Sequence, residues 1–152
     1  MINKVKIKGK SHIQLFDKDG KLKDERFVTN TITNAGDAHI ADRMSSVPGE
    51  SAMSHMAVGT GSTAAAVGDT TLQTELDRNA LTSFAQGAGA DDNDVIYIGD
   101  WAAGDATGTI TEAGILNAAA AGTLLARQVF TGIAKGASDT LKITWTITYG
   151  AS

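Results

Sequence analysis

The sequence predicts an all-β protein, a jelly-roll-like antiparallel β-sandwich with one or two short helices. Apolar and polar residues alternate over short segments along much of the 152-residue chain, and a period of two is the pattern of a strand with one buried face. Segments that contain glycine separate these runs, and helical spacing is clear in one region. Eight or nine strands with so little helix favour a sandwich over an α/β enzyme, whose strands and helices alternate regularly.

The N-terminal segments predict a β-hairpin. Lysines alternate with apolar residues over residues 4–8, and residues 12–16 are followed by residues 21–28 across the segment Asp17-Lys18-Asp19-Gly20. Glycine accepts a positive φ without steric cost, so Asp-Gly between two alternating segments is a strong signal for a hairpin turn. We therefore expect the chain to reverse there.

One helix is predicted over residues 34–45. Asn34 can cap it with its side-chain oxygen, and Asp37 falls in the first turn, where the positive end of the helix dipole favours an acidic residue. The residues at helical spacing behind them are Ala38, Ala41 and Met44. A second, shorter helical turn is possible over residues 72–78.

The other strands show the same alternation. Four are predicted in the middle of the chain, over residues 54–60, 79–86, 94–101 and 109–117. At the C-terminus, apolar residues alternate with Lys and Thr over residues 141–149, which is the clearest strand in the sequence. Residues 123–130 form its expected antiparallel partner, because the intervening residues 131–138 contain two glycines that let the chain reverse.

Charge is distributed unevenly along the chain. The formal net charge is −4, from 13 Lys and Arg against 17 Asp and Glu, yet residues 1–26 carry eight basic and four acidic side chains. A basic head and an acidic remainder attract each other, within one chain or between chains. We therefore divide the chain into a basic N-terminal strand or hairpin, residues 1–28, that could act as a docking arm, and a β-sandwich body, residues 29–152.

Composition also argues against several partners and sites. The acidic net charge disfavours binding to nucleic acid. No apolar run approaches the roughly 18 to 20 residues that span a bilayer, so we expect no membrane partner and synthesis in the cytoplasm. The absence of cysteine excludes a disulfide framework, a thiolate metal site and a cysteine nucleophile.

Two acidic segments superficially suggest cation binding. Asp17-Lys18-Asp19-Gly20 begins like a calcium loop, but its glycine comes too early, and Val28 stands where an EF-hand needs a carboxylate. Asp91-Asp92-Asn93-Asp94 could bind a hard cation through its oxygens. Consecutive residues do not naturally converge on one point, so we favour a solvated loop.

The remaining motifs give no catalytic constellation. Gly59-Thr60-Gly61 lacks the Gly-Lys-Ser/Thr of a phosphate-binding loop. His12, His39 and His55 lie in different segments without metal-ligand spacing. A triad assembled from distant segments stays open, although no Gly-x-Ser-x-Gly motif supports it. We expect neither an enzyme nor a bound metal or cofactor.

Glu112 is a candidate for a structural ion pair. It interrupts an otherwise apolar and small stretch, residues 110–117, and alternation places it on the same face as Gly114 and Leu116. Burying an unpaired carboxylate is costly, so such a residue needs a partner. The candidates are Arg78 and Arg127.

Five segments together resemble small β-rich structural proteins of tailed bacteriophages. Their order and approximate spacing are similar, and the resemblance covers most of residues 30–150. The segments are His-Met-Ala-Val-Gly-Thr-Gly-Ser-Thr-Ala at 55–64, Asp-Thr-Thr-Leu at 69–72 leading to Glu75, residues 110–117, Leu-Leu-Ala-Arg at 124–127, and residues 139–147. Proteins of this kind decorate the capsid or form part of a tail appendage, and the resemblance brings no catalytic residues with it.

The resemblance implies a capsid decoration (cement) protein on the outer head surface of a virion. Its partners would be the major capsid protein and further copies of itself, as a homotrimer that bridges shell subunits. Lys4, Lys6, Lys8 and Lys10 are the candidate capsid-docking residues, because a basic segment binds acidic neighbours. Alternatively, these lysines form the wet face of an edge strand and discourage unwanted sheet pairing.

Two other functions remain open. A tail-fibre or baseplate module belongs to the same structural class. A carbohydrate-binding domain on the virion surface would need an exposed aromatic ring to stack on sugars, for which Trp101 is the candidate, whereas Trp145 is expected in the core.

Overall fold

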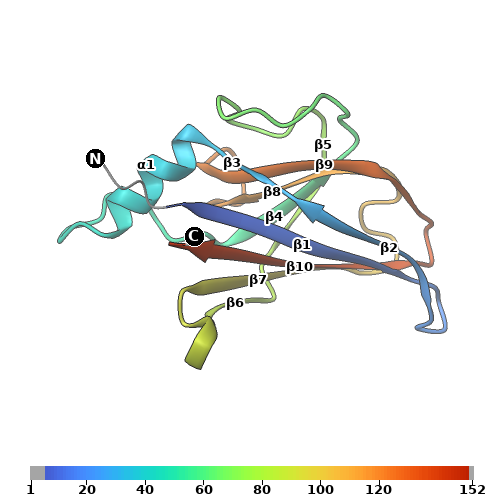
Figure 1. Cartoon of the computed structure of the whole chain (residues 1–152). Helices are drawn as coiled ribbons and strands as arrows, with labels where there is room; N and C mark the ends of the chain where they lie inside the picture. The colour runs from blue at the N-terminus through green and yellow to red at the C-terminus, as the bar shows by residue number, and fades with distance from the viewer. Residues whose placement is uncertain (1–5, 151–152) are drawn as a thin grey trace.

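The computed structural model describes residues 6–150 and consists of two antiparallel β-sheets packed face to face (Figure 1). Sheet A has the order β2-β1-β10-β7-β6, and sheet B has the order β3-β9-β8-β4-β5. The all-β sandwich predicted from the sequence is confirmed.

The strands of sheet A are β1 (Ile7–Phe16), β2 (Leu22–Thr29), β6 (Ser83–Gln86), β7 (Asp94–Trp101) and β10 (Thr140–Tyr149). The strands of sheet B are β3 (Thr31–Ile32), β4 (His55–Gly59), β5 (Glu75–Ala80), β8 (Gly108–Leu116) and β9 (Leu124–Lys135). The helices are α1 (Asn34–Arg43) and the 3-10 turn η1 (Gly89–Asp91).

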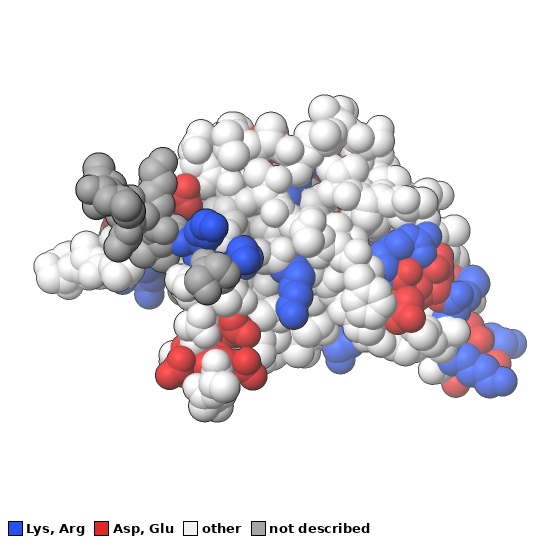
Figure 2. Space-filling view, viewed as in Figure 1, with Lys and Arg blue, Asp and Glu red and all other residues white. Residues whose placement is uncertain are grey.

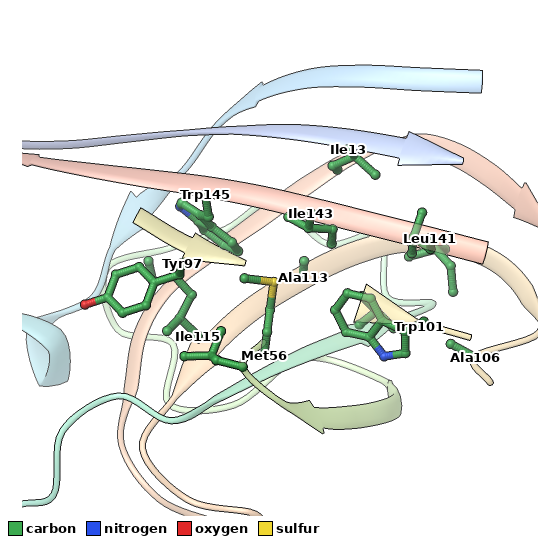
Figure 3. Close-up of a cluster of buried hydrophobic side chains, with 14 of the residues drawn as sticks. Ile13, Met56, Tyr97, Trp101, Ala106, Ala113, Ile115, Leu141, Ile143 and Trp145 are labelled. Atoms are coloured by element: carbon green, nitrogen blue, oxygen red, sulfur yellow. The ribbon is translucent and has the colours of Figure 1, made fainter. Parts of the chain in front are cut away.

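The core lies between the sheets and is built from alternate residues of each strand. In β10 the inward side chains are Leu141, Ile143, Trp145 and Ile147, each at most 1% exposed. They stack on residues of sheet B such as Met56 and lie beside Trp101 and Tyr97 of β7 (Figure 3). The residues between them in β10 face outward, as the period-two pattern predicts.

The N-terminal hairpin is an integral part of sheet A. Gly20 has φ +79°, and Asp17 Oδ1 accepts the N–H groups of Asp19 and Lys21, so the turn forms as its sequence predicts. β1 pairs with β10 along its whole length and contributes Ile13 to the core. The described part of residues 1–28 therefore belongs to the sandwich. Its outward face, which carries Lys8 and Lys10, is the side exposed to solvent.

Three predicted elements differ from those observed. The strand expected over residues 79–86 is two strands, because the chain leaves sheet B at Ala80 and enters sheet A at Ser83. The helical turn considered at 72–78 is largely extended, as part of β5. β9 continues through Gly132 to Lys135, so the chain reverses later than predicted.

The cap of α1 is Thr33 and not Asn34, so the sequence prediction was wrong at this position. Thr33 Oγ1 accepts the N–H of Gly36 at 2.9 Å and donates to the carbonyl oxygen of Leu124 at 2.5 Å. The first turn lies so close to β9 that a Cβ at Gly36 would come within 2.3 Å of the Leu125 carbonyl oxygen. Contact with β9 thus decides which residue caps the helix.

We expect Thr33→Ala to lower the free energy of unfolding by about 1 to 2 kcal/mol, because it removes the cap and leaves a buried carbonyl without its donor. Asn34→Ala serves as the matched control and should change stability by less than about 0.5 kcal/mol. Urea unfolding followed by circular dichroism measures both. Equal losses in the two variants would contradict the assignment of the cap.

Candidate functional site

A buried ion pair joins two adjacent interior strands of sheet B, β8 and β9. Glu112 in β8 is 0% exposed and Arg127 in β9 is 2% exposed, and Arg127 Nε donates to Glu112 Oε2 at 2.9 Å. Of the two arginines that the sequence offers as partners, the structure pairs Arg127 with Glu112. Arg78 instead binds Glu75, at 2.7 Å.

The ion pair fastens the long connection between β4 and β5 to the outer face of sheet B. Both side chains are bonded to this connection. Glu112 accepts backbone N–H groups from Gly61 at 3.0 Å, Gln73 at 2.9 Å and Thr74 at 2.7 Å. Arg127 donates to Asp69 Oδ2 at 2.9 Å and to the carbonyl oxygen of Thr63 at 3.0 Å. The connection thereby covers a small apolar cluster of Ala57, Leu72, Leu116 and Leu124.

The carboxylate of Glu112 is held in its ionised form. Burial alone would raise its pKa, but hydrogen bonds from the backbone of Thr74 and Gln73, from Arg127 and from the backbone of Gly61 outweigh burial and hold the pKa below its ordinary value. Both oxygens are occupied and inaccessible to solvent. Glu112 therefore has a structural role, because its hydrogen bonds all go to groups of the chain itself.

The outer face of sheet A is different, because it carries exposed basic and apolar side chains. Lys8 and Lys10 project from β1 opposite Thr148 and Thr146 of β10, and Lys6 precedes the strand. All three are exposed, and within residues 6–150 none of them makes a salt bridge. Figure 2 shows basic side chains in a row across this face. The fourth candidate docking residue, Lys4, lies outside the described residues.

A groove runs beside the lysine row. Phe27 of β2 is 75% exposed and stacks on its cross-strand partner His12, with ring centroids 4.3 Å apart. His12 Nε2 lies 2.7 Å from Glu25 Oε2. The groove has a volume of about 410 Å³ and is lined by Lys10, Ser11, His12, Phe27, Val28, Thr29, Thr144 and Thr146. We call this groove and the lysines around it the sheet A face.

Acidic side chains gather at the other edge of sheet A. Asp91 and Asp92 lie in the turn between β6 and β7 and are exposed. Figure 2 shows acidic side chains together at the lower left, where Figure 1 places this turn. Asp94 starts β7 and accepts a hydrogen bond from Thr148 Oγ1 at 2.5 Å. Among the described residues no group of three or more His, Asp or Glu side chains is placed to hold a metal ion.

Trp101 does not have the surface position that sugar stacking requires. It is 1% exposed, because β7 turns Tyr97, Gly99 and Trp101 toward the core. Trp145 is in the core, as expected, and its Nε1 donates to Asn30 Oδ1 at 2.9 Å. The exposed Phe27 is not among the residues predicted from the sequence. Phe27 lies two residues from Glu25 and from Thr29 and therefore shares their outer face. An apolar residue at such a position gives no local sign of how much of its ring stays exposed.

The histidines lie apart from one another and have different partners. His39 of α1 is 2.7 Å from Glu50, and His55 of β4 is 2.8 Å from Ser54 Oγ.

Comparison with protein-family models, with curated proteins and with solved structures found no match for this chain. No described helix has the length and apolar character needed to cross a bilayer.

We expect Glu112→Gln to lower the free energy of unfolding by about 3 kcal/mol, because it leaves the buried Arg127 without its full counter-charge. Glu75→Gln, in the more exposed pair with Arg78, should cost less than about 1 kcal/mol. Urea unfolding of the three proteins at neutral pH measures the difference. A loss in Glu112→Gln no larger than in Glu75→Gln would contradict the anchoring role.

The same pair predicts acid sensitivity. The pKa of Glu112 is lower in the folded state than its ordinary value of 4.5, so its stabilising contribution is complete above that pH and is lost as the pH falls below it. We expect the wild-type protein to lose stability between about pH 5 and about pH 3 more steeply than Glu112→Gln. Thermal unfolding across this range measures both slopes, and parallel slopes would argue against the contribution of Glu112.

Proposed function

We propose that this chain is a virion structural protein that decorates the outer surface of a bacteriophage capsid and stabilises the shell by bridging its subunits. Its partners are the major capsid protein and further copies of the same chain in a homotrimer. The resemblance of five segments to small β-rich phage proteins supports this proposal, and so does the sandwich architecture.

The observation that carries the proposal is the contrast between the two faces of the sandwich. In sheet B, Glu112 and Arg127 are buried and hold the β4–β5 connection in place. Sheet A instead presents exposed lysines and an exposed phenylalanine on its outer strand surface. Such a surface suits contact with another folded protein, because buried aromatic groups and complementary charges dominate specific interfaces.

Lys6 and Lys8 are the residues best placed to meet the shell. They lie at the start of β1, at one end of sheet A, where a partner can approach along the strand direction. Linked copies that each make a modest contact can together bind a shell firmly, because each contact raises the effective concentration of the next copy at the shell surface. The protein would act through this contact and not through turnover.

Reversal of the charges at this end tests the proposal. We expect Lys6→Glu/Lys8→Glu to reduce occupancy on purified capsids that lack the protein by at least about tenfold, because like charges then face each other. Lys18→Glu/Lys21→Glu in the hairpin turn makes the same change in net charge at the opposite end of β1 and should bind as the wild type does. Sedimentation with capsids and gel densitometry measure occupancy.

Unchanged occupancy of the Lys6→Glu/Lys8→Glu variant would remove these lysines from the contact with the shell. A wild-type protein that fails to bind capsids at any concentration would overturn the decoration function itself.

A further inference from the structure

We propose that the end of the sandwich that carries α1 seats on a shell subunit, and that the apolar loop after α1 enters a recess in that subunit. The inference rests on the proposed function, because it names the part of the chain that meets the shell beside Lys6. In Figure 1 this loop lies at the same end as the start of β1 and the end of β10. We call the loop at residues 44–50, the groove beside it and Lys6 the α1 end.

The loop carries the two most exposed large apolar side chains among the described residues. Met44 and Val47 are each 83% exposed. They belong to a stretch, residues 44–49, that contains no charged residue. A single exposed apolar residue is ordinary, but apolar side chains that lie together on a surface mark a site of contact with a partner.

Hydrogen bonds close this loop at its base. Asp42 Oδ1 accepts the N–H of Gly49 at 2.9 Å, and Asp42 Oδ2 accepts the N–H of Glu50 at 2.9 Å. Arg43 Nη1 donates to the carbonyl oxygen of Glu50 at 2.9 Å, and His39 lies 2.7 Å from the Glu50 carboxylate. The backbone that carries the apolar side chains is therefore already ordered, which reduces the entropy that binding must remove.

An apolar groove opens beside the loop. It has a volume of about 410 Å³, and Met44, Ala52, Met53, Tyr97 and Tyr149 are among its lining residues. The Tyr97 hydroxyl points away from the rest of the core cluster (Figure 3). The groove has room for an apolar side chain, because a cavity of about 150 Å³ already admits benzene. A projecting loop next to a hollow fits a folded partner that has the opposite relief.

Charged groups lie on both sides of the groove, and Tyr149 connects it to each of them. On the β1 side, Gly150 N donates to the Lys6 carbonyl oxygen at 2.9 Å. On the β7 side, Tyr149 N donates to the Asn93 carbonyl oxygen at 3.0 Å, which places the acidic residues 91–92 beside this end. An apolar centre with a polar rim is the usual composition of a protein–protein interface.

The acidic part of the rim favours a protein over the other large partners. Bilayer surfaces and nucleic acids are negatively charged and would be repelled by Asp91 and Asp92. A protein surface can present an apolar recess to Met44 and Val47, an apolar side chain to the groove, and a charge of the right sign to each side. The shell contact then extends from Lys6 across the groove to the loop.

Oxidation by hydrogen peroxide, followed by mass spectrometry, tests this contact on the full chain. Met44 is 83% exposed, whereas Met53 and Met56 are at most 3% exposed, so Met44 should oxidise much faster than these two in the free protein. On purified capsids that lack the protein, bound wild type should oxidise at Met44 at least about tenfold more slowly, because the shell covers the side chain.

Three variants test the loop and the groove without any change at Lys6. Met44→Ser/Val47→Ser should raise the dissociation constant for capsids on the order of 100-fold, because two apolar side chains lose their burial in the partner. Ala52→Arg places a long side chain at an exposed position on the groove and should also weaken binding. Leu22→Ser is the matched control: Leu22 is 49% exposed beside the hairpin turn, at the opposite end of β1, and its variant should bind as the wild type does. Sedimentation with capsids over a range of protein concentrations measures binding, and urea unfolding checks that each variant is folded.

A wild type that binds capsids while Met44 oxidises at the rate of the free protein would overturn the inference and leave the proposed function standing. A Met44→Ser/Val47→Ser variant that binds as tightly as the wild type would do the same. Protection of Met44 in concentrated protein without capsids would assign the α1 end to a second copy, and protection by vesicles of phosphatidylglycerol would assign it to a bilayer; either result contradicts the inference. A wild type that fails to bind capsids would overturn the proposed function and this inference with it.

Discussion

The ion pair of Glu112 and Arg127 holds a long connection over one of the two outer faces of this sandwich. A sandwich has two outer faces, and the long connection between β4 and β5 lies over one of them because its backbone donates to a buried carboxylate. Without that anchor, a loop rich in small residues would have little apolar surface to hold it in place beyond Leu72. One charged pair, inaccessible to any ligand, therefore shapes the surface of sheet B.

Sheet A shows the opposite use of charge. Its lysines are exposed and spaced two residues apart along β1, which pairs with β10 throughout and with β2 from Lys10 onward, so the sheet fixes the spacing of their backbone positions. The acidic turn at the far edge of the same sheet is likewise ordered by backbone hydrogen bonds.

Much of the fold could be predicted from the sequence, because alternation is a local property. Trp145 and its neighbours in β10 face inward as their spacing requires, and Gly20 takes the positive φ that the hairpin turn needs. The prediction failed where distant segments decide the outcome. Thr33 caps α1 because a carbonyl oxygen of β9 accepts a hydrogen bond from its hydroxyl, and Trp101 is buried because its face of β7 packs against sheet B.

The sequence by itself determined the class of the fold, the hairpin and the need of Glu112 for a basic partner, because each depends on neighbours along the chain or on the cost of burying a charge. Only the tertiary structure decided which arginine that partner is and which face remains exposed. The exposed face depends on strand order, which pairs β1 with β10 and β4 with β8 across long separations in sequence, and Arg127 is the partner because its strand β9 pairs directly with β8. Local patterns do not encode that order, because many pairings bury the same apolar faces equally well.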